Sequence, residues 1–107
     1  MEEIIKKANE LGLMLQQTAE YTNFKKSEQI LISDKQSREL YETYENSLLE
    51  LEQKQKMGIL EQFEIEELKE MRDLIDENEI IQEYMQTKEK YINILMVIQN
   101  ELNLTDY

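Results

Sequence analysis

The side chains with the clearest chemical potential in this chain are carboxylates. Carboxylate oxygens bind hard cations, but a calcium-binding loop alternates Asp and Asn around a glycine, and a di-iron bundle needs Glu-x-x-His motifs. The densest acidic cluster has neither pattern, and the chain contains no histidine. We therefore interpret the cluster as a solvated helix face, and we expect no metal site and no bound cofactor. Its members are Glu61, Glu64, Glu66, Glu67, Glu70, Asp73 and Asp76.

Most other catalytic groups are missing from the sequence. Cysteine and histidine, which carry most nucleophilic and redox chemistry, do not occur at all. No serine lies beside a base, and no glycine-rich loop could cradle a phosphate. The six tyrosines are of a type that more often packs than catalyses. Composition leaves acid–base catalysis by paired carboxylates open, but no pair stands out. We predict that the protein is not an enzyme and has no catalytic residues.

The elements that must carry these side chains are helices. The 107 residues include no proline and two glycines, and apolar residues recur at spacings of three and four almost throughout. Proline and glycine are the residues that break helices, so this pattern predicts an all-α protein. The length suits a single helical domain over residues 1–107.

We expect two N-terminal helices within about residues 2–32. The first runs from about Glu2 to Gln17, and Thr18 caps the second, which extends to about Ile32. Residues 33–36 (Ser-Asp-Lys-Gln) match a capping box with Ser33 as the cap of a third helix. That helix ends at Gly58, because glycine readily adopts the left-handed conformation that follows a helix.

After Gly58 we expect a fourth helix and then a last helix from about Glu79 to Asn103. Residues 76–79 either interrupt this segment or only kink it. The predicted architecture has four to five helices. The third helix forms a long antiparallel hairpin with the fourth and fifth over about residues 34–103, and the N-terminal helices pack against it.

The last helix is apolar around most of its circumference between Tyr91 and Ile98, where only Asn93 is polar. A helix of this kind is buried on more than one side, and in a small chain a second subunit can provide the second surface. We therefore predict a homo-oligomer, with a dimer favoured. The candidate oligomer interface is Tyr84, Tyr91, Ile92, Ile94, Leu95, Val97, Ile98 and Leu102.

The net charge is −12, from 12 basic and 24 acidic residues. Nucleic-acid binding depends on Lys and Arg at the phosphates, so we expect no direct contact with nucleic acid, despite the basic pair Lys25 and Lys26. A basic partner protein suits the charge better. We propose Glu66, Glu67 and Glu70 as the candidate acidic partner surface.

Membrane insertion is not expected, because the longest apolar run, residues 94–98, is far shorter than a membrane span. The first residues include Glu2 and Glu3, where a signal peptide is basic. We expect a cytoplasmic protein.

An ordered set of helix-packing positions resembles the YlbF/YmcA family of small bacterial proteins. The first helix contributes Ala8, Leu11, Gly12 and Leu15, followed by Thr18-x-x-Tyr21-x-x-Phe24. Further matches are residues 53–58 (Gln-Lys-Gln-Lys-Met-Gly), residues 66–68 (Glu-Glu-Leu) and residues 78–84 (Asn-Glu-Ile-Ile-Gln-Glu-Tyr). The resemblance covers about residues 3 to 102.

The resemblance implies a cytoplasmic, non-catalytic, all-α protein that oligomerises. Some members of the family regulate competence, sporulation and biofilm development, in association with related proteins and with the membrane-anchored endoribonuclease that initiates mRNA decay. Members that bind iron–sulfur clusters use cysteines, which this chain lacks. We predict a non-enzymatic regulatory adaptor that acts by protein–protein interaction. The alternative is a structural or chaperone-like helical oligomer without a dedicated regulatory partner.

Overall fold

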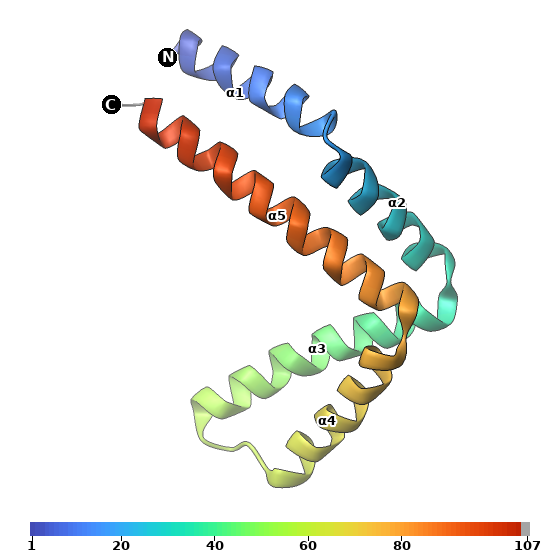
Figure 1. Cartoon of the computed structure of the whole chain (residues 1–107). Coiled ribbons are helices and arrows are strands. Elements are labelled where there is room, and N and C mark those ends of the chain that lie inside the picture. The colour runs from blue at the N-terminus through green and yellow to red at the C-terminus, as the bar shows by residue number, and fades with distance from the viewer. Residues whose placement is uncertain (106–107) are drawn as a thin grey trace. The chain divides into compact units, whose positions relative to one another are not determined.

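The computed structural model describes the backbone of residues 1–105 and the side chains of residues 1–101. It contains five helices and no strand within that range, so the prediction of an all-α fold is confirmed. The helices are α1 (Glu2–Gln16), α2 (Ala19–Ser33), α3 (Lys35–Met57), α4 (Gln62–Glu77) and α5 (Glu79–Thr105) (Figure 1). Their bounds lie within two residues of the predicted ones, apart from those of α4, for which no bounds were predicted.

The junction between α1 and α2 is organised by Thr18. The Thr18 hydroxyl donates to the carbonyl of Leu15 at 2.6 Å, and its oxygen accepts from the backbone N–H of Tyr21 at 3.2 Å. The Leu15 carbonyl also accepts from the backbone N–H of Thr18 at 3.1 Å. One residue therefore bonds to the last turn of the first helix and to a free N–H in the first turn of the second, as helix ends require. The predicted cap is confirmed.

The capping box predicted for α3 is wrong by one residue. Ser33 is the last residue of α2, and the cap is Asp34, whose carboxylate accepts from the backbone N–H of Ser37 at 3.1 Å. Hydrogen bonds from Ser37 lower the pKa of the Asp34 carboxyl below its usual value. A carboxylate suits this position because it also interacts favourably with the positive end of the helix dipole.

The end of α3 follows the prediction. Gly58 adopts a left-handed conformation with φ of 73°, which a residue with a side chain rarely adopts. The N–H of Ile59 donates to the carbonyl of Lys54 at 3.0 Å, and that of Gly58 donates to Gln55 at 3.2 Å. These two bonds form a Schellman motif, which satisfies carbonyls that the helix leaves free.

Residues 76–79 interrupt the helix, and the break lies at Asn78. The extended backbone of Asn78 separates α4 from α5, and its side-chain oxygen accepts from the N–H of Ile81 at 2.9 Å. Gln82 donates from its side chain to the carbonyl of Ile75 at 3.0 Å. Asn78 therefore caps α5, while Gln82 gives one carbonyl at the end of α4 a second donor beside the Asn78 N–H.

The chain forms two compact units, and the division falls within α2 and α5. Unit 1 comprises residues 1–28 together with the chain from residue 84 onward, and unit 2 comprises residues 29–83. The single domain over residues 1–107 remains a prediction.

Unit 2 is built on a hairpin of α3 and α4 (Figure 1). Its buried apolar residues are Leu31, Tyr44, Ile75 and Ile81, of which the last two are almost fully enclosed. The predicted long hairpin is therefore divided. Helix α4 pairs with α3, whereas α5 from Tyr84 onward belongs to unit 1.

Unit 1 has an aromatic centre shared by α2 and α5. Phe24 is buried and stacks on Tyr91, with ring centroids 4.9 Å apart and planes inclined by 10°. Tyr21 also contacts Tyr91, and Tyr84 contacts Phe24, at 5.8 and 5.7 Å between centroids. Such aromatic pairs contribute beyond the area they bury. The aromatic residues of the two helices therefore hold this part of unit 1 together.

Candidate functional site

The negative charge of the protein is concentrated in unit 2. Residues 29–83 hold 16 acidic and 6 basic residues, a net charge of −10, whereas the rest of the chain carries only −2. The two structural units therefore separate the charge more sharply than a division of the sequence at Gly58, which gives −3 for residues 1–57 and −9 for residues 58–107. This separation makes the surface of unit 2 the first candidate for recognition of a charged partner.

A groove runs along one side of the α3–α4 hairpin. Two hollows of about 210 and 440 Å³ adjoin each other, because both are lined by Glu67 and Met71. Helix α3 contributes residues from Gln36 to Lys54, and α4 contributes residues from Phe63 to Leu74. We call this surface the α3–α4 groove. Its acidic lining residues are Glu39, Glu50, Glu64, Glu67 and Glu70, and its large apolar ones are Leu40, Leu51, Phe63, Leu68, Met71 and Leu74.

The three acids proposed from the sequence as a partner surface are all exposed. The structure places Glu67 and Glu70 in the α3–α4 groove, but Glu66 does not line it. Sequence reasoning did not find Glu39 and Glu50, because they come from α3 and reach the groove only through the pairing of the two helices. Phe63 could have been found from the sequence, because it is a large aromatic residue among acidic ones at the start of α4.

Lys54 is the one basic residue that lines the α3–α4 groove. Its Nζ lies 2.9 Å from an oxygen of Glu64. This hydrogen bond raises the pKa of Lys54, and the negative charges of Glu64, Glu50 and Glu61 raise it further. The groove therefore favours a positive charge on the one cationic side chain that it contains.

The predicted oligomer interface divides into two sets of residues. Tyr84 and Tyr91 contact α2 of the same chain, and Ile94, Leu95 and Ile98 are half-buried. Ile92 and Val97 are exposed, with 39% and 60% of their surface accessible. The side chain of Leu102 lies outside the described residues. Part of the apolar stripe is thus used within the chain, and the interface itself remains a prediction.

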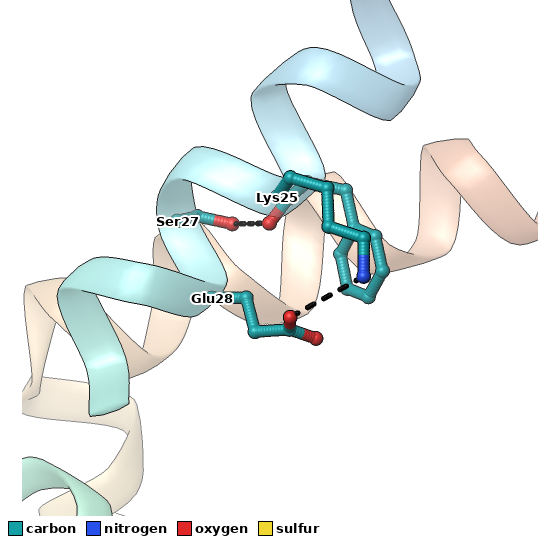
Figure 2. Close-up of polar contacts among 4 residues, drawn as sticks. Lys25, Ser27 and Glu28 are labelled. Atoms are coloured by element: carbon teal, nitrogen blue, oxygen red, sulfur yellow. Dashed lines mark hydrogen bonds and ion pairs between the residues drawn. The ribbon is translucent and has the colours of Figure 1, made fainter. Parts of the chain in front are cut away.

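Lys25, one residue of the basic pair that could have contacted a phosphate, makes contacts within the chain. Lys25 reaches toward Glu28, with 3.5 Å between Nζ and the carboxylate oxygen, as Figure 2 shows. Its ammonium also lies over the rings of Tyr21 and Phe24, at 5.9 and 5.7 Å from the centroids. These contacts favour a structural role for Lys25.

Among the side chains of residues 1–101, no three acidic groups gather in a way that could hold a metal ion. In the same part of the chain, no helix has the length and apolar character needed to cross a membrane.

Comparison with known families gives a match over nearly the whole chain. The family model described as "Control of competence regulator ComK, YlbF/YmcA" matches residues 4–104. The chain belongs to the YlbF/YmcA family. The resemblance inferred from the helix-packing positions is therefore confirmed. Searches of the curated proteins and of the solved structures found no match.

Membership assigns the chain to a family of regulators. The residues that carried the resemblance to this family have structural roles. Thr18 and Gly58 act at helix ends, Phe24 and Tyr84 pack in unit 1, and Asn78 links α4 to α5. These family-like positions therefore organise the fold, while the acidic residues of the groove lie on its surface.

Proposed function

We propose that this YlbF/YmcA protein is a non-enzymatic regulatory adaptor that acts by protein–protein contact. The observation that carries the proposal is the family match over residues 4–104, because the family is described by the control of a competence regulator. The α3–α4 groove supports it, since it combines apolar and charged side chains as protein-binding surfaces do.

The proposed setting is the cytoplasm, with no membrane insertion and no direct nucleic-acid contact. The candidate partners are those that the family resemblance implies, namely related family proteins or an endoribonuclease. Through them the protein acts in developmental regulation or mRNA decay in a bacterium. The net charge of −10 on unit 2 supports a partner with a basic surface.

Affinity capture from the native cell, followed by mass spectrometry, tests the adaptor. We expect one defined partner at stoichiometric yield. The triple variant Glu66→Gln, Glu67→Gln, Glu70→Gln should capture less of it, and the loss should shrink as salt rises, because salt screens exposed charges. Glutamine keeps the length of the side chain and its helix propensity. If the variant captures equally at every salt concentration, the acidic surface serves solubility and the binding residues are apolar.

A matched variant controls for the loss of three charges. Glu2, Glu3 and Glu10 are exposed residues of α1 in unit 1. Their replacement by Gln removes the same charge from outside the proposed surface, so capture should stay as in the wild type.

The alternative function is a structural or chaperone-like helical oligomer. Exposed apolar side chains on α1 and α5 of unit 1 favour it, including Leu13, Met14, Met96 and Val97. A holdase suppresses the aggregation of many unfolded proteins, so the same capture experiment would return a broad set of clients. Aggregation assays with two unrelated unfolded proteins distinguish the two functions.

A further inference from the structure

The α3–α4 groove is long enough to hold a helix. Its lining on α3 extends from Gln36 to Lys54, which corresponds to about 27 Å of helix at 1.5 Å per residue. Two large apolar side chains of α4, Phe63 and Leu74, remain 53% and 56% exposed in it. Between them on the same face lie Glu67 and Glu70, at spacings of four, three and four residues. The exposed face of α4 is therefore apolar at both ends and acidic in the middle.

The charges of the groove define what can occupy it. Five acidic residues line it against the single base Lys54, which is already paired with Glu64. A helix bound there needs apolar side chains to cover Phe63 and Leu74, and basic ones to meet the acids. A helix that binds in a groove typically inserts apolar side chains that are spaced three or four residues apart.

A second copy of this chain does not provide that helix. None of the five helices in residues 1–105 has a net positive charge, since α2 is neutral and α4 carries −5. Two copies joined at this groove would also bring together two units of charge −10, which repel each other. A helix from a different protein is the better occupant.

We propose that the α3–α4 groove binds a basic amphipathic helix of about 18 residues from a partner protein. The proposal rests on the proposed adaptor function and names the chemistry of its partner. Phe63 and Leu74 are the apolar anchors of the groove, and Glu67 and Glu70 select the positive charge.

The test uses the full-length protein and synthetic 18-residue peptides of leucine, lysine and alanine. One peptide places leucine at spacings of three and four with lysine beside the stripe. A second has the same composition in an order that forms no apolar face, and a third replaces every lysine by glutamate. Fluorescence anisotropy gives the Kd of each. We expect the first peptide to bind at least about tenfold more tightly than either control.

Two matched pairs of variants on α4 locate the site. Glu67→Gln with Glu70→Gln should weaken binding of the first peptide about tenfold at low salt. Glu66→Gln with Asp73→Asn removes the same charge from exposed residues that do not line the groove. This second pair should change the Kd by less than about twofold. Phe63→Ala should also weaken binding about tenfold, independently of salt.

Three results would overturn the groove proposal. The two charge pairs could weaken binding equally, or the scrambled peptide could bind as tightly as the first, and either would mean unspecific attraction. Phe63→Ala could instead halve the mass of the protein in light scattering, which would place a second copy in the groove. None of these results bears on the adaptor function, which fails only if the native cell yields no stoichiometric partner.

Discussion

The side-chain amide of Asn78 donates a hydrogen bond of 2.9 Å to the hydroxyl of Ser37, which lies 41 positions earlier in the chain. Ser37 is buried in the first turn of α3, where its own backbone N–H donates to Asp34. Asn78 also caps α5. One amide therefore joins the start of α3 to the break between α4 and α5, which closes the open end of the α3–α4 hairpin in unit 2.

Asn78→Ala should destabilise the protein by about 1–3 kcal/mol, because it removes a helix cap and the bond to a buried hydroxyl. Ser37→Ala removes only the bond and should cost about 1 kcal/mol. Urea unfolding at fixed protein concentration measures both. Asn46→Ala, at an exposed position within α3, is the control and should change stability little. Equal losses for Asn78→Ala and Asn46→Ala would contradict the linking role.

The two glycines should respond in opposite directions to replacement by alanine. Gly58 has φ of 73°, so Gly58→Ala should destabilise the protein by about 1 kcal/mol. Gly12 lies within α1 with open space around the position of a β-carbon, so Gly12→Ala should stabilise the protein by about 0.5–1 kcal/mol. Thermal unfolding of the two variants gives the signs. A stabilising Gly58→Ala would exclude the left-handed conformation.

The Asp34 cap predicts a loss of stability in acid. Its folded-state pKa is lowered by hydrogen bonds from Ser37. The stabilisation is therefore fully present above the ordinary value of 3.8, and is lost as the pH falls through the lower folded-state value. Asp34→Asn keeps an acceptor but does not titrate. Unfolding midpoints from pH 7 to pH 2 should show that the wild type loses its advantage over this variant in acid. A constant difference would contradict the charged cap.

Local signals in the sequence were sufficient for the helices and for most of their ends. Thr18 and Gly58 were identified correctly because a cap acts on residues within one turn, so its chemistry is readable from neighbours. Ser33 was preferred to Asp34 because both side chains can cap a helix and they are adjacent. Which one caps depends on where the preceding helix ends, and that is set by packing.

Contacts between helices could be predicted less well from the sequence. Tyr84 and Tyr91 were predicted as part of an oligomer interface, because periodicity does not say which helix covers an apolar stripe. Phe24 of α2 in the same chain contacts both rings. The candidate groove shows the same limit. Glu67 and Glu70 were found as acids of one helix, whereas Glu39 and Glu50 join them only because α3 and α4 pair.

The last prediction concerns the dimer that the apolar part of α5 led us to expect. Leu95→Asp would not test it cleanly, because Leu95 is half-buried and its change can unfold the chain. Val97 is 60% exposed, so Val97→Asp should leave the helices intact while it places a charge in the expected interface.

Leu49→Asp is a matched control, since Leu49 is 59% exposed within α3 and belongs to neither candidate surface. Light scattering at micromolar concentration should give twice the chain mass of 12.9 kDa for the wild type and for Leu49→Asp, and the single mass for Val97→Asp. Circular dichroism should show the same helix content in all three. A wild-type protein with the single mass would contradict the dimer, and dissociation by Leu49→Asp alone would place the interface on α3.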